Sequence, residues 1–135
     1  MVETSNASGA VDGGVRNLLC IEGFMLLSCA MTLYWRVGGD WKQFALLFLT
    51  PDLGFAGYLA GPRVGALSYN MMHSTVAPLV LSACAVVLNS HLALAVALIW
   101  MAHIGFDRAL GYGLKHSRGF GFTHLGRIGR SARQS

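Results

Sequence analysis

Long apolar stretches separated by short polar connectors make up most of this sequence. A membrane-spanning helix needs about 20 largely apolar residues, and four stretches approach or exceed that length. Those stretches cover residues 17–36, 43–60, 64–88 and 91–112. The connectors are rich in turn-forming and helix-capping residues and lie at 37–40, 61–63 and 89–90. Because short connectors join antiparallel neighbours, the pattern predicts an all-α, antiparallel four-helix transmembrane bundle.

Composition supports a membrane protein and excludes several other classes. Of the 135 residues, 54% are hydrophobic and only 12% are charged, with a mean hydropathy of +0.52. Soluble domains carry about 25% charged residues, and a small one buries only about two-thirds of its unfolded surface. The three cysteines, at 20, 29 and 84, lie in apolar stretches without the spacing of a zinc site. Disordered, fibrous and disulfide-stapled classes are therefore excluded.

The positions of lysine and arginine predict the orientation in the membrane. Two of them, Arg36 and Lys42, lie beside the connector 37–40. Seven belong to the opposite side: Arg16, Arg63, Lys115, Arg118, Arg127, Arg130 and Arg133. Positively charged loops face the cytoplasm, so four spans place both termini there (N-in/C-in). We expect a multi-pass protein of the bacterial inner membrane.

Two cytoplasmic tails are predicted to flank the membrane domain, which covers 15–114. Residues 1–14 are small and polar and are expected to be disordered. Residues 115–135 are basic with interleaved aromatic side chains, a combination that binds membrane lipids through their anionic headgroups. Since these basic residues complete the orientation signal, we expect no nucleic-acid partner.

Polar side chains inside the spans are the candidates for function, because each charged one costs about 2.5–3.5 kcal/mol at a helix centre. They are Glu22, Asp52, Asn70, His73, His103, Asp107 and Arg108. At about 1.5 Å of rise per residue, the carboxylates and histidines among them fall in a similar layer of the cytoplasmic half. His103 and Asp107 are four residues apart and share a helix face. Asn70 and His73, three residues apart, do the same.

Carboxylates and histidines that converge in a helical bundle are typical of a metal centre. The predicted ligands for Zn, Fe or Mn are Glu22, Asp52, His73, His103 and Asp107. Glu22 is also a candidate general base, and Asn70 a candidate catalytic residue that orients the site. The candidate binding residues for a phosphate or carboxylate headgroup are Arg63, Arg108 and Lys115. The hypothesis is a membrane-embedded, metal-dependent hydrolase of a lipid or another amphiphilic substrate.

Four other interpretations use the same residues. The polar groups can form a purely structural hydrogen-bonded network, or they can relay protons or ions in a transporter. His73 and His103 can be the axial ligands of a b-type haem in an electron-transfer protein. The chain can also be a non-catalytic subunit of a membrane assembly. A homodimer through the face of Gly57 and Gly61 is a further expectation, because small residues at this spacing let helices approach closely.

Several motifs resemble a family of small bacterial membrane proteins known as domain of unknown function 4260. They are Pro51-Asp52, residues 57–66, Tyr69-Asn70 with His73, residues 103–115 and residues 123–126. Glu22-Gly23 in the first predicted helix is also similar, so the resemblance covers nearly the whole chain. A looser likeness, the order Pro-Asp, His-Ser and His-x-x-x-Asp, is similar to membrane-bound proteins regarded as metal-dependent hydrolases. That likeness implies hydrolytic chemistry.

Overall fold

The computed structural model describes residues 13–115 and 122–127, and most of them are helical. In chain order the helices are α1 (Gly13–Arg36), α2 (Trp41–Leu47), the 3₁₀ helix η1 (Thr50–Ala60), α3 (Pro62–His73), α4 (Val76–Val87) and α5 (His91–Ala109). Two short antiparallel strands follow, β1 (Phe122–Thr123) and β2 (Gly126–Arg127). The helical class is therefore confirmed. Most of the two predicted tails lies outside the described residues.

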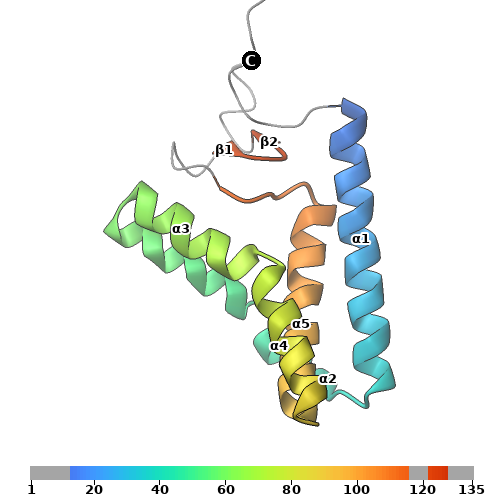
Figure 1. Ribbon diagram of the computed structural model, residues 1–135. Helices are drawn as coiled ribbons and strands as arrows, with labels where there is room; N and C mark the ends of the chain where they lie inside the picture. Colours follow the sequence, from blue (N-terminus) through green and yellow to red (C-terminus); the bar gives the residue numbers. More distant parts are fainter. Residues whose placement is uncertain (1–12, 116–121, 128–135) are drawn as a thin grey trace, which may run out of the picture.

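Helix α5 is the centre of the molecule. It packs along α1 on one side and along α4 on the other (Figure 1). Glycine makes the contact with α1 close, since a Cβ added to Gly105 would lie 2.6 Å from the backbone nitrogen of Leu27. Nine residues of α5 are buried, compared with three of α1. Helix α5 is thus the element against which the others are positioned.

Within the described residues, three helical stretches are long and apolar enough to cross a membrane. They are Gly13–Arg36, Pro62–Val87 and His91–Ala109. Many of their outward side chains are apolar, and Val87 and Leu92 are 78% and 67% exposed. Extended apolar surface is unfavourable against water but is matched by lipid chains. The helices therefore have the length and the surface of an integral membrane protein.

The second and third predicted spans are less continuous than the sequence pattern suggests. Residues 43–60 do not form one α-helix, because α2 ends at Leu47 and the chain continues as η1. Pro51 explains the break, since proline lacks an N–H and its ring crowds the carbonyl four residues back, that of Leu47. Pro78 stands in the same relation to Ser74, where α3 has ended. The molecule contains more and shorter helices than the predicted four-helix bundle.

Helices η1 and α3 form a hairpin that leans away from the column of α1, α5 and α4 (Figure 1). Gly61 turns the chain between them with a φ of 116°, a value that favours glycine. Gly57 packs inside the hairpin, where an added Cβ would lie 2.6 Å from Cβ of Ser68. Part of the face expected for a homodimer is therefore used within the chain, and the dimer stays a prediction. The base of the hairpin brings Asp52 and His73 to α5.

Candidate metal centre

Four of the predicted ligands converge where η1, α3 and α5 meet. Asp52, His73, His103 and Asp107 each offer one ligand atom, and these atoms all lie within 4.8 Å of one another. We call these four residues the His–Asp cluster. Both histidines are buried and both aspartates are partly buried. The helical rise per residue predicts a group of this kind, and Glu22 is the one predicted ligand outside it.

The two imidazoles face each other and both carboxylates. Their Nε2 atoms lie 3.1 Å apart. Nε2 of His73 is 3.4 Å from Oδ1 of Asp52 and 3.3 Å from Oδ2 of Asp107. Nε2 of His103 is 3.4 Å and 3.7 Å from the same two oxygens. All four donor atoms therefore surround one point.

Proline and helix geometry place the side chains that form the cluster. Pro51 ends the α-helical ladder and leaves Asp52 in the first turn of η1. His73 is the last residue of α3, just before the break that Pro78 imposes. His103 and Asp107 lie four residues apart on α5 and so share a face.

The tautomer of His73 follows from its second nitrogen. Nδ1 lies 3.0 Å from the carbonyl oxygen of Tyr69, which can only accept, so Nδ1 carries the hydrogen and donates. In the neutral ring, Nε2 then presents a lone pair to the carboxylate oxygens of Asp52 and Asp107. Lone pairs facing carboxylates repel one another unless a proton or a metal cation lies between them. This is the arrangement by which a backbone carbonyl orients a metal-binding histidine.

The distances from the two Nε2 atoms are close to those of tetrahedral zinc coordination. Ligand atoms about 2.0–2.2 Å from a tetrahedral ion lie about 3.3–3.6 Å from one another. The two Nε2 atoms lie 3.1 Å from each other and 3.3 to 3.7 Å from the carboxylate oxygens. The 3.1 Å between the two Nε2 atoms leaves no room for a porphyrin, so the haem alternative is not supported.

Aromatic side chains hold the two histidines in place. The ring of Tyr69 stacks on the imidazole of His73, with centroids 3.8 Å apart and planes within 13°. The hydroxyl of Tyr69 donates to Oδ2 of Asp107 at 3.3 Å. Phe48 packs its ring edgewise against His103 at 5.2 Å between centroids. The rings and the hydrogen bond limit the movement of three of the four ligands.

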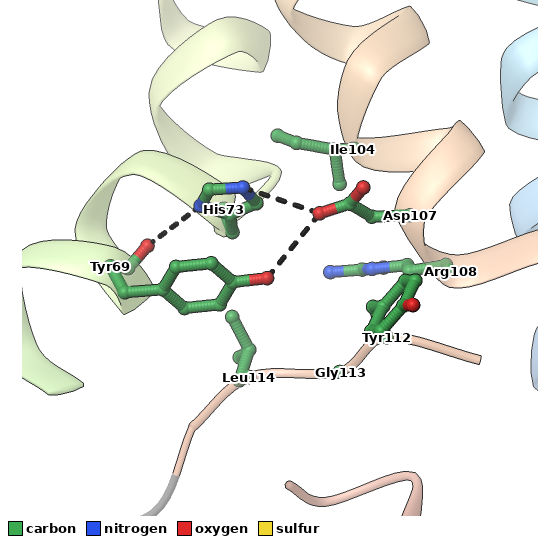
Figure 2. A pocket seen from close by; sticks show the side chains of 8 residues that line it. All are labelled: Tyr69, His73, Ile104, Asp107, Arg108, Tyr112, Gly113 and Leu114. Carbon is green, nitrogen blue, oxygen red and sulfur yellow. Dashed lines mark hydrogen bonds and ion pairs between the residues drawn. The ribbon is translucent and has the colours of Figure 1, made fainter. Parts of the chain in front are cut away.

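A small cavity of about 10 Å³ lies beside the cluster (Figure 2). Its lining residues are Tyr69, His73, Ile104, Asp107, Arg108, Tyr112, Gly113 and Leu114. A volume near 10–15 Å³ of this kind holds about one water molecule. The cavity therefore offers one water position next to two of the four ligands.

The chain that follows α5 crosses one side of this cavity. Asn70 fixes it, because its side chain donates to the carbonyl of Lys115 at 2.8 Å and accepts from the Lys115 nitrogen at 2.6 Å. His124 adds a second attachment, since its Nδ1 accepts from the Leu114 nitrogen at 2.8 Å. Asn70 thus holds the backbone of the capping segment, residues 112–115. Neither this role nor the contact of His124 has a periodic signal in the sequence.

The predicted residues outside the cluster divide into two kinds. Glu22 is exposed on α1 and lies apart from the four ligands, although its charge acts on Arg108. Arg63 is exposed at the start of α3. Arg108 and Lys115, in contrast, lie close to the site: Arg108 lines the small cavity, and Nζ of Lys115 is 5.2 Å from the centre of the Tyr69 ring. Burial lowers the pKa of Lys115 to about 8, while the charge of Asp107 acts in the opposite direction.

Comparison with known proteins establishes the family. The model of the family described as "Domain of unknown function (DUF4260)" matches residues 16–128. The chain belongs to this family, which confirms the resemblance drawn from its motifs. No curated protein and no solved structure matches the chain. All four residues of the His–Asp cluster lie within the matched range.

Proposed function

We propose that this protein is an integral membrane protein that binds one divalent metal ion in the His–Asp cluster. The observation that carries the proposal is the convergence of two imidazole nitrogens and two carboxylates, with the His73 ring oriented by the Tyr69 carbonyl. Zn²⁺ is the first choice because these distances are close to those between the ligands of a tetrahedral zinc ion. Fe²⁺ and Mn²⁺ accept the same imidazole and carboxylate ligands.

We propose hydrolysis as the chemistry of this centre. A divalent ion supplies Lewis acidity and lowers the pKa of a bound water. The small cavity provides one water position beside His73 and Asp107. Tyr69 holds Asp107 through its hydroxyl, and Arg108 brings a positive charge to the cavity wall. The residues fit attack by water on an ester or related bond whose developing negative charge Arg108 stabilises.

We also propose that the chain crosses the bacterial inner membrane four times, with both termini in the cytoplasm. The crossings would be α1, the α2–η1 segment, α3 with α4, and α5. Support comes from the distribution of positive charge: Arg16, Arg63 and Lys115 lie at one end of these segments and Arg36 at the other. The basic tail would then lie on anionic headgroups of the cytoplasmic leaflet.

Metal analysis of the purified protein tests the proposed centre. The wild type in detergent is analysed by mass spectrometry for bound metals, beside His103→Ala and Asp107→Ala. His91→Ala is the matched control, because His91 lies on the same helix but is exposed. We expect equimolar zinc in the wild type and in His91→Ala, and a loss of metal in the two cluster variants.

Two results would count against this proposal. A well-folded wild type without metal, after purification in zinc-supplemented medium, would leave the cluster as a structural network. Equal metal content in all four proteins would place any bound zinc elsewhere in the chain.

An absorption spectrum of the same samples checks for haem. A Soret band that persists in His103→Ala would show a cofactor site outside the cluster.

A further inference from the structure

A second cavity lies next to the His–Asp cluster, and its character is different. Its volume is about 160 Å³, and its lining residues are Leu47, Thr50, Pro51, Met72, Val96, Ile99 and Trp100. Thr50 is the single lining residue with a hydroxyl group, and it is exposed. The remaining side chains are apolar, with the indole N–H of Trp100 as their one hydrogen-bonding group. The cavity therefore offers shape and apolar contact and almost no polar recognition.

Residues in the wall of this cavity are sequence neighbours of residues in the cluster. Pro51 directly precedes Asp52, and Met72 directly precedes His73. Ile99 lies one helical turn before His103 on α5. An occupant of the cavity would consequently lie beside the residues proposed to bind the metal.

Trp100 keeps the cavity wall in place at the end of α3. Its indole Nε1 donates to the carbonyl oxygen of Met72 at 2.6 Å. That carbonyl belongs to the last turn of α3, where no further helical N–H follows. The hydrogen bond satisfies the polar atom of the indole, so the remainder of the ring is available for apolar contact. This hydrogen bond fixes the Trp100 side of the wall and leaves the interior of the cavity open.

We propose that this cavity binds the hydrocarbon chain of a membrane amphiphile, with the polar end of that molecule near the cluster. Val96, Ile99 and Trp100 lie in the middle of α5, a helix of membrane-spanning length, so the cavity is at the depth of lipid chains. Leu46 and Leu49, which are next in sequence to the lining residues Leu47 and Thr50, are 80% and 63% exposed. The assignment of this amphiphile as a substrate rests on the proposed hydrolytic centre. Binding of its hydrocarbon chain in the cavity does not depend on that centre.

The size of the cavity limits what it can hold. An engineered cavity of about 150 Å³ lined by apolar side chains holds one benzene molecule. At about 160 Å³, this cavity therefore takes a segment of roughly six carbons. That length matches part of a single acyl chain and excludes a whole diacyl lipid from the cavity. The rest of the acyl chain would remain in the bilayer.

Fluorescence quenching of Trp100 tests this proposal directly. The chain has three tryptophans, so the double substitution Trp35→Phe and Trp41→Phe leaves Trp100 as the reporter. A single-chain fatty acid brominated on its chain is titrated into this variant in non-brominated detergent, with the unbrominated fatty acid as blank. We expect saturable quenching that ends at an equimolar ratio of probe to protein.

A matched pair of substitutions on α5 locates the binding. Val96→Phe fills the cavity from its wall, while Leu92→Phe makes a similar change one turn earlier on the exposed face. We expect Val96→Phe to lower the affinity for the brominated fatty acid by about tenfold or more. Leu92→Phe should leave the titration unchanged. Quenching that rises linearly with probe, and is equal in both variants, would overturn the proposal.

Zinc content is measured in the same samples so that the two proposals fail separately. Saturable quenching without bound metal would keep the chain-binding cavity and remove the hydrolytic centre. Bound zinc with non-saturable quenching would keep the centre and remove the cavity as a chain site. Val96→Phe is expected to retain the wild-type zinc content, because Val96 offers no ligand atom.

Discussion

At His73, a single backbone carbonyl orients the imidazole and fixes which ring nitrogen carries the hydrogen. Tyr69 supplies that carbonyl, stacks its ring on the imidazole and donates its hydroxyl to Asp107. One residue therefore acts on two of the four ligands. The sequence pointed to His73 through its polarity within an apolar stretch. Tyr69 has no such signal, because a tyrosine in a membrane helix is equally typical of the lipid–water interface.

Replacing Tyr69 by phenylalanine tests this supporting role. Tyr69→Phe keeps the stacked ring and the carbonyl but removes the hydrogen bond to Asp107. We expect zinc affinity to fall by about tenfold to a hundredfold, the usual cost of losing a residue that orients a ligand. Competition with a fluorescent chelator measures the change. Tyr112→Phe, a cavity residue, is the control, and an equal loss in both variants would contradict the role.

Lys115 predicts a pH dependence of stability. Its pKa falls from 10.5 to about 8 on burial in the folded protein. Between these two values the unfolded chain binds more protons than the folded one, so the free energy of unfolding rises with pH from about 8 to 10.5. Thermal unfolding in detergent across this range measures the rise, and Lys115→Met should flatten it. Parallel profiles for the two proteins would show that another group is responsible.

At the scale of elements, prolines and glycines determine how the helices meet. An α-helix ends four residues before Pro51 and another ends five residues before Pro78, and both breaks lie beside a residue of the cluster. Helix interruptions in a membrane are tolerated where polar groups or neighbouring helices satisfy the freed backbone. Here the Trp100 indole satisfies the carbonyl of Met72. The breaks therefore position Asp52 and His73. The two prolines predict them, whereas hydropathy averages over the prolines and shows continuous stretches.

The close contact of α1 with α5 is testable by adding one methyl group. Gly105→Ala places a Cβ 2.6 Å from the backbone of Leu27, so the two helices must separate. We expect a loss of about 1–3 kcal/mol in unfolding free energy, typical of overpacking. Gly14→Ala is the control, since an added Cβ there meets nothing within 4 Å. Denaturant titration in mixed micelles compares them, and equal stability of both variants would argue against a tight contact.

For the whole molecule, the sequence predicts the helical class and four of the residues that converge in the cluster. The depth count placed five side chains in one layer, and the structure brings four of them together. Glu22 differs because depth gives no information about which side of α1 it occupies, and that side is exposed. The capping segment was also beyond prediction, because Asn70 and Lys115 are 45 residues apart and their contact has no periodicity. Depth along a helix follows from counting, whereas rotation about its axis follows from packing.

The order of the ligands along the chain has a consequence for biosynthesis. Asp52 and His73 are made first, and His103 and Asp107 follow on α5, the last long helix. The cluster is therefore incomplete in every nascent chain that lacks α5, and two separate ligands hold a metal far more weakly than four assembled ones. If the cluster binds a metal as proposed, metal capture is the final event of membrane insertion. A chain truncated before α5 could span the bilayer, yet it would leave the translocation machinery without its metal site.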